Sequence, residues 1–213
     1  MAPTRIGRFH VLTDFHYQQR FTHPELARLA ILGGADTIQF RHKFGGIRHI
    51  LFQSMETAEV CRELRTPLLV DDRLDVMLAC GADGVHLGHA DFPIKYARSV
   101  LGTEAIIGGS ATTLQEARRC VEEGVDYVGF GPVFATASKR NPASVKGLDG
   151  LAAVCEALDV PVVAIGGITA ERVDVILRAG AHGVAVMAAV TSAEDPEAAA
   201  REIRYSIDAA IRS

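Results

Sequence analysis

Hydrophobic and polar positions along this chain repeat in two kinds of segment. Short apolar runs rich in Val and Ile, typical of buried strands, are each followed by a longer stretch with the spacing of an amphipathic helix. We count eight such strand–helix units. The expected strands span residues 9–14, 37–43, 67–72, 84–88, 105–111, 127–133, 161–168 and 183–190.

Helix boundaries are also marked in the sequence. Gly33 follows the first helical stretch and Gly81 follows the third, as glycine does at many helix C-termini. Either Thr112 or Thr113 is placed to cap the helix after the fifth strand. The chain ends in a further amphipathic helix, so each expected strand is followed by a helix.

Strands that are apolar on both faces predict a parallel sheet covered by helices. Eight consecutive units of this kind favour an α/β fold, a single closed (β/α)8 TIM barrel, as one domain over residues 1–213. The alternative is an open doubly wound sheet. Its dinucleotide-binding form would carry a G-x-G-x-x-G sequence after the first strand, and this chain lacks one there.

Composition narrows the class of protein. Of 213 residues, 48% are hydrophobic and 23% charged, which suits a globular protein with a large core. The net charge of −4 and the pI near 6.1 argue against nucleic-acid or anionic-membrane partners. Four widely spaced cysteines predict neither a disulfide framework nor a zinc site. The N-terminus resembles no signal peptide, so we expect a cytoplasmic enzyme acting on small molecules, as a monomer or a homo-oligomer.

The stretch YVGFGPVFATASK at 127–139 combines a strand, a Gly-Pro break and a polar loop. Loops of this kind at strand ends hold the chemistry of many α/β enzymes. Thr136, Ser138 and Lys139 offer two hydroxyl donors and an ammonium group, which suits an anion. The alternative is a solvated connection.

The second strand places three polar residues in alternation. Gln39, Arg41 and Lys43 share one face, and two cations there favour an anionic ligand. The alternative is a strand end in solvent.

Acidic residues follow the third and fourth strands. Asp72, beside Asp71, and Asp91 lie at neighbouring strand ends, where carboxylates can converge on Mg²⁺. Asp72 and Asp91 as helix caps are the alternative. His86 and His89 are more typical of core or supporting positions than of metal ligands.

Small residues mark the remaining strand ends. Ser110 lies at the end of the fifth strand and adds a hydroxyl donor, and Gly167 lies near the end of the seventh. The backbone of Ala188 and Ala189, at the end of the eighth, lies where many (β/α)8 enzymes bind phosphate through main-chain N–H groups. A tight turn made for packing is the alternative.

Seven ordered motifs together resemble the thiamine-phosphate synthase family, also called thiamine-phosphate pyrophosphorylase, over nearly the whole chain. They are VLTD, QFRHK, DDR, HLGHAD, GGS, GPVFATASK and GGI. The resemblance implies condensation of hydroxymethylpyrimidine diphosphate with a thiazole phosphate. The products would be thiamine phosphate and pyrophosphate, with Mg²⁺ as cofactor.

The resemblance also implies roles for individual residues. Gln39 would bind the pyrimidine, and Asp72 and Asp91 would bind Mg²⁺. The diphosphate would be held, and its departure assisted, by Arg41, Lys43, Ser110 and Lys139. The thiazole phosphate would be held by Thr136, Ser138, Gly167, Ala188 and Ala189.

Two departures keep other functions open. Asp71, expected to contact substrate, replaces a family asparagine, and Ala188 replaces a common serine. A non-catalytic relative that binds thiamine phosphates is therefore one alternative. A thiazole tautomerase is another, although that activity implies a histidine where this chain has Pro132. A sugar-phosphate epimerase is a more distant alternative.

Overall fold

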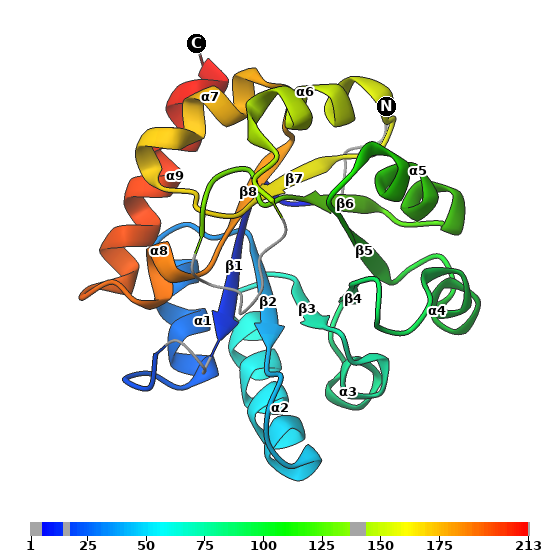
Figure 1. Ribbon diagram of the computed structural model, residues 1–213. Helices are drawn as coiled ribbons and strands as arrows, with labels where there is room; N and C mark the ends of the chain where they lie inside the picture. Colours follow the sequence, from blue (N-terminus) through cyan, green and yellow to red (C-terminus); the bar gives the residue numbers. More distant parts are fainter. Residues whose placement is uncertain (1–5, 15–17, 137–143, 213) are drawn as a thin grey trace.

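The computed structural model describes residues 6–14, 18–136 and 144–212, and its eight strands form a closed parallel barrel in chain order. Helices surround the strands (Figure 1). The strands are β1 Phe9–Asp14, β2 Thr37–Arg41, β3 Leu68–Asp71, β4 Gly84–Leu87, β5 Ile106–Ala111, β6 Tyr127–Phe130, β7 Val162–Ile165 and β8 Gly183–Val186. The predicted (β/α)8 barrel is confirmed.

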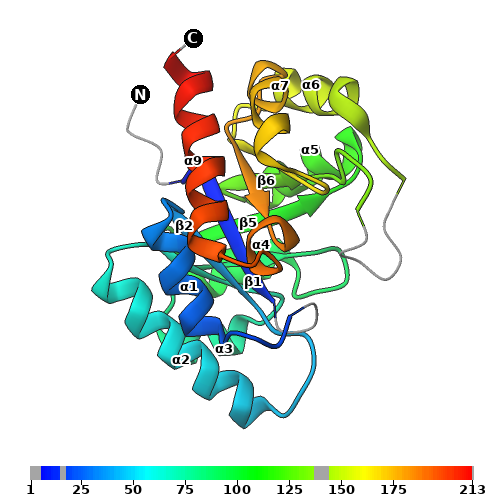
Figure 2. The ribbon, with the colours of Figure 1, turned by 90° about the vertical axis from the view of Figure 1, so that its left-hand side faces the viewer.

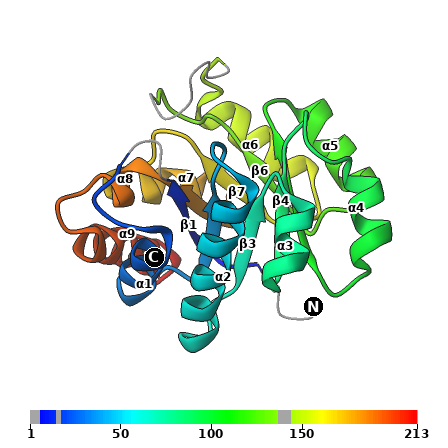
Figure 3. The same ribbon diagram turned by 90° about the horizontal axis from the view of Figure 1, so that it is seen from below.

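The helices follow the strands as the sequence predicts. They are α1 His23–Leu32, α2 Ile47–Glu63, α3 Leu74–Cys80, α4 Ile94–Leu101, α5 Leu114–Glu123, α6 Gly147–Ala157, the 3-10 turn η1 Ala170–Arg172, α7 Val173–Arg178, α8 Ala188–Thr191 and α9 Pro196–Arg212. The last helix, α9, runs beside α1 in two perpendicular views (Figures 2 and 3). It therefore covers the outside of the barrel near the β1–β8 closure. Within the described ranges, no helix combines the length and apolarity needed to cross a bilayer.

Side-chain caps fix the start of α1 and of α5. Thr22 and Glu25 form a reciprocal capping box at α1. Of the two candidate caps of α5, Thr113 is the one used, since its hydroxyl accepts the N–H of Glu116 at 3.2 Å. At the C-terminal end of α3, Gly81 has φ of 66°, a left-handed conformation that favours glycine.

The sequence overestimates the C-terminal ends of several strands. β2 ends at Arg41, β6 at Phe130 and β7 at Ile165, in each case before the predicted end. Proline at 132 has no N–H for a ladder, and Gly166 has φ of 103°, outside the strand region. The prediction for 183–190 is also wrong beyond Val186, because α8 begins at Ala188. The loops at the C-terminal ends of these strands therefore begin earlier than the sequence predicts.

At the N-terminal end of the barrel, aspartate side chains form hydrogen bonds that link neighbouring strands. Three of them, each directly before an even-numbered strand, accept an N–H from the first or second residue of the preceding strand. The pairs are Asp36 with Phe9 at 2.9 Å, Asp83 with Leu68 at 2.8 Å and Asp126 with Ile107 at 2.7 Å. A repeated contact of this kind indicates a structural role for this end of the barrel.

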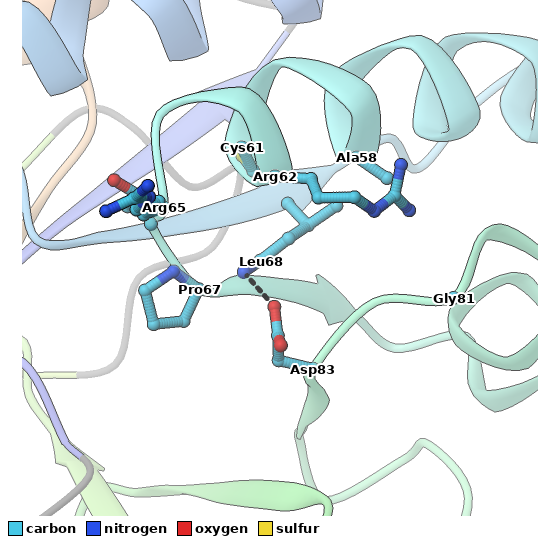
Figure 4. A pocket seen from close by; sticks show the side chains of 9 residues that line it. Ala58, Cys61, Arg62, Arg65, Pro67, Leu68, Gly81 and Asp83 are labelled. Atoms are coloured by element: carbon cyan, nitrogen blue, oxygen red, sulfur yellow. Dashed lines mark hydrogen bonds between the residues drawn. The ribbon is translucent and has the colours of Figure 1, made fainter.

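A cavity of about 300 Å³ opens at this same end, between α2 and the start of β3 (Figure 4). Its lining includes Arg62, Arg65 and Asp83. None of the residues predicted to bind substrate or metal lines it. The cavity is therefore separate from the candidate site.

Close packing of neighbouring strands makes glycine necessary at Gly84, where an added Cβ would collide with the backbone oxygen of Ile106. Gly84→Ala should lower the free energy of unfolding by about 1–3 kcal/mol, because overpacking forces the strands apart. Gly150, inside α6, has ordinary space for a Cβ, with Lys146 at 3.4 Å. Gly150→Ala should raise the same quantity by about 0.5–1 kcal/mol.

Urea denaturation followed by circular dichroism would measure both changes against the unmodified protein. Equal stability of the two variants would contradict the close approach at Gly84.

Candidate active site

The predicted site residues of β2, β3 and β5 lie at the C-terminal rim of the barrel or just inside it, together with Asp14 of β1, which was not predicted. Asp14, Arg41 and Asp71 are the last residues of β1, β2 and β3, and Ser110 is next to last in β5. Parallel neighbours place these ends side by side, with Asp14 opposite Arg41 in the ladder. Barrel closure therefore gathers polar groups that are far apart in the chain.

The three polar residues of the second strand take different directions. Gln39, only 3% exposed, lies inside the barrel, where its Nε2 bonds to His10 at 2.9 Å and to Tyr127 at 3.2 Å. Arg41 bonds to the carboxylate of Asp14. Lys43 lies beyond the end of β2, and its Nζ is 2.6 Å from Oδ2 of Asp72. The prediction of one shared strand face is therefore wrong for Lys43, although both cations lie at the rim.

Three carboxyl groups gather beside these cations. Asp71 is 8% exposed, and its Oδ1 has no hydrogen-bond partner within the described residues. Burial, followed by the nearby charge of Asp72, raises the pKa of Asp71 well above its ordinary value. Burial also raises the pKa of Asp91, and the charge of Asp72 contributes to that rise. Burial, and in second place the charge of Asp72, thus opposes the ionisation of Asp71 and Asp91.

Helix capping does not explain these acids. The N-cap of α3 is Arg73 and that of α4 is Pro93. Asp72 instead adopts a left-handed φ of 66°, and Asp91 accepts the N–H of Gly88 at 2.7 Å within a tight turn. The capping alternative is therefore excluded for both residues.

The carboxyl groups at the rim suit a hard cation that keeps some of its water ligands. Across the described ranges, no three His, Cys, Asp or Glu residues are arranged to hold a metal by themselves. Mg²⁺ needs fewer protein ligands, since water and substrate phosphate complete its coordination. The unpartnered Oδ1 of buried Asp71 beside Asp72 and Asp91 fits such an ion.

Two histidines at the rim have other contacts. His86 bonds through Nδ1 to Tyr127 at 2.8 Å and through Nε2 to Ser110 at 2.9 Å. His89 bonds to Glu116 at 3.1 Å and to Arg119 at 2.7 Å. Their ring nitrogens therefore serve as supports, in agreement with the expectation from sequence.

The loop after β6 is described as far as Thr136, which is half-buried. Ser138 and Lys139 lie outside the described residues. Gly167 has φ of 64°, and an added Cβ there would collide with the Ala135 carbonyl oxygen. The turn after β7 thus packs directly on the loop after β6, and glycine is required for that contact.

Ala188 and Ala189 begin the short helix α8. Amides in a first helical turn have no acceptor within the helix itself. The N–H groups of Ala188 and Ala189 therefore belong to the start of a short helix and not to the end of a strand.

The sequence did not point to several residues that contact the predicted site residues. His10 and Asp14 are polar residues on a buried strand, which was a usable signal for inward-facing groups. Tyr127 was interpreted only as part of an apolar strand. Its hydroxyl lies between Gln39 and His86, a contact across the barrel that no local pattern encodes.

Comparisons with known proteins agree with this arrangement. The sequence model of a family described as thiamine monophosphate synthase matches residues 9–190. A thiamine-phosphate synthase of Salinibacter ruber is 60% identical over 99% of this chain and 93% of its own length. Another from Methanocella arvoryzae is 49% identical over 93% of each chain.

A solved structure gives the same result. Thiamine phosphate pyrophosphorylase from Pyrococcus furiosus superposes with a TM-score of 0.88 at 38% identity, covering 96% of both chains. A 3-hexulose-6-phosphate synthase, with a TM-score of 0.66 at 20% identity, shares the fold alone. By its family match and its identity to these relatives, the chain belongs to the thiamine-phosphate synthase family of transferases.

Proposed function

We propose that the protein joins hydroxymethylpyrimidine diphosphate to thiazole phosphate, giving thiamine phosphate and pyrophosphate. The observation that supports this most directly is the rim, where Arg41 and Lys43 lie among the carboxyl groups of Asp71, Asp72 and Asp91. Cations suit a diphosphate, and the acids suit the metal ion that accompanies it. A site for a neutral ligand would need neither.

The diphosphate would be held by cations and donors from several strands. Arg41 and Lys43 would exchange their carboxylate partners for phosphate oxygens, and Ser110 would add a hydroxyl donor. Asp71 would contact the substrate through its unpartnered Oδ1. Lys139, outside the described residues, is assigned to the same group from its motif.

Asp72 and Asp91 would hold Mg²⁺, with Asp71 beside them. When bound, Mg²⁺ would offset negative charge on diphosphate oxygens. Lys43, about a third exposed at 35%, pairs with Asp72 and would bring its ammonium to the same oxygens. These residues would thus stabilise the leaving group before it departs.

The pyrimidine ring would lie next to Gln39, on the barrel side of the residues assigned to the diphosphate. Both amide hydrogens of Gln39 are directed to His10 and Tyr127, so its Oε1 is the atom available to accept a hydrogen bond from a pyrimidine amino group. The C–O bond to the diphosphate would break with its electron pair on the leaving oxygen. The thiazole nitrogen would then supply the electron pair for the new C–N bond.

The thiazole phosphate would bind on the other side of the rim. Thr136, Ser138 and the backbone N–H groups of Gly167, Ala188 and Ala189 are assigned to it, with Ser138 placed from its motif alone. Because main-chain donors suffice, alanine at 188 in place of a family serine keeps an N–H contact.

Metal removal gives the first test. We expect the purified protein to form thiamine phosphate from the two substrates with Mg²⁺, to stop when EDTA is in excess, and to resume when Mg²⁺ is restored. Product would be separated and quantified by chromatography. Lack of product at high enzyme concentration would refute the synthase proposal, and tautomerase activity without condensation would favour the isomerase alternative.

Asp72→Asn gives a sharper test of the metal-binding role. Asparagine tolerates the left-handed backbone at this position, so the fold is kept while the charge is removed. We expect kcat/KM to fall at least about a hundredfold, as for loss of a catalytic electrostatic group. The matched control is Asp75→Asn, which removes an exposed acid paired with Arg73 outside the site. A wild-type rate for Asp72→Asn would exclude the role.

A further inference from the structure

The barrel interior contains a continuous row of polar contacts that reaches the rim. Its members come from five strands: His10 of β1, Gln39 of β2, Tyr127 of β6, His86 of β4 and Ser110 of β5. The consecutive contacts measure 2.9, 3.2, 2.8 and 2.9 Å. Only Ser110, the last member, has a proposed contact with the diphosphate.

The carbonyl group of Gly7 decides which atoms donate and which accept in the first hydrogen bonds of this row. His10 Nε2 is 3.1 Å from the carbonyl oxygen of Gly7, which can only accept, so this nitrogen carries the proton. Burial lowers the pKa of His10 to about 4, which keeps the ring neutral near pH 7. Its Nδ1 is then an acceptor. Gln39 must therefore present its amide nitrogen to His10, and its second N–H reaches the Tyr127 oxygen.

Tyr127 accepts a hydrogen bond from Gln39 and donates one to His86. Gln39 Nε2 cannot accept, so within the described part of the chain Nδ1 of His86 is the one recorded acceptor for the Tyr127 O–H. Burial raises the pKa of Tyr127 well above its ordinary value, which keeps the hydroxyl proton in place. His86, accepting at Nδ1, carries its own proton at Nε2. That N–H donates to Ser110 Oγ.

Two glycines make room for this row. His86 on β4 and Tyr127 on β6 both lie level with Gly108 of the intervening strand β5. An added Cβ at Gly108 would collide with both rings, and one at Gly129 would lie 2.9 Å from the His86 ring. The contact between Tyr127 and His86 therefore depends on the absence of side chains at these two strand positions.

We propose that Tyr127 and His86 are positioning residues that fix Ser110 as a hydrogen-bond donor to the diphosphate. With Oγ accepting from His86, the Ser110 hydroxyl hydrogen has no acceptor among the described residues and is available to an anion at the rim. A freely rotating serine could instead present a lone pair to the anion. This inference rests on the proposed function for its catalytic consequence, but the hydrogen-bond direction does not depend on that function.

The direction can be measured without substrates. In protein labelled with 15N at histidine, long-range 1H–15N spectra near neutral pH should show His86 with its proton on Nε2. In Tyr127→Phe, which lacks the donor to Nδ1, this tautomer should lose its dominance. Tyr205→Phe is the matched control, since Tyr205 is 77% exposed on α9. A proton on Nδ1 of His86 in the unmodified protein would overturn the proposal, whatever the variants do.

A double-mutant cycle tests the consequence for catalysis. Tyr127→Phe should lower kcat about tenfold, as for one misdirected hydrogen bond. In a Ser110→Ala background the same substitution should have almost no further effect, because Tyr127 acts through Ser110. An equal loss in both backgrounds would overturn the proposal. Absence of turnover by the unmodified protein would refute the synthase function, while the tautomer measurement would still decide the hydrogen-bond direction.

Discussion

Closure of the sheet between β1 and β8 is the constraint on which the rest of the structure depends. Pairing of Phe9 with Val184 leaves the described sheet without an open edge and brings the C-terminal ends of all eight strands to one rim. Residues 14, 41, 71 and 110 meet there although nearly a hundred positions separate the first from the last. At the opposite end, Asp36, Asp83 and Asp126 bond to the starts of the strands. One end thus gathers the candidate site residues, and the other carries repeated structural contacts.

Most of the fold could be predicted because its determinants are local. Apolar runs mark each strand, and caps such as Thr113 or glycines such as Gly81 mark the helix ends. The errors fall at the C-terminal strand ends, where apolar residues continue after the ladder has stopped. Ala188 is an example, since its apolar neighbours suit either a strand or the short helix that forms there. Hydrophobicity alone does not distinguish the two.

The partners of the site residues could not be predicted in the same way. Alternation assigns Gln39 and Arg41 to one face of a strand, but it does not say that one points inward to Tyr127 and the other toward Asp14. Those choices depend on depth along the barrel and on side chains from other strands. The family resemblance predicts residues for the diphosphate and the metal. It did not identify Asp14 or Tyr127, because their contacts exist only once the barrel has closed.

Asp71, the departure from the family pattern, has an electrostatic explanation. Burial and the neighbouring Asp72 raise the pKa of its carboxyl group, which favours the uncharged form. An uncharged carboxyl group offers one donor and one acceptor, as the side of an asparagine amide does. The position can therefore keep the hydrogen-bonding capacity of an amide beside an anionic group. Asp72, by contrast, is 23% exposed and paired with Lys43, so the two adjacent aspartates differ in both their surroundings and their partners.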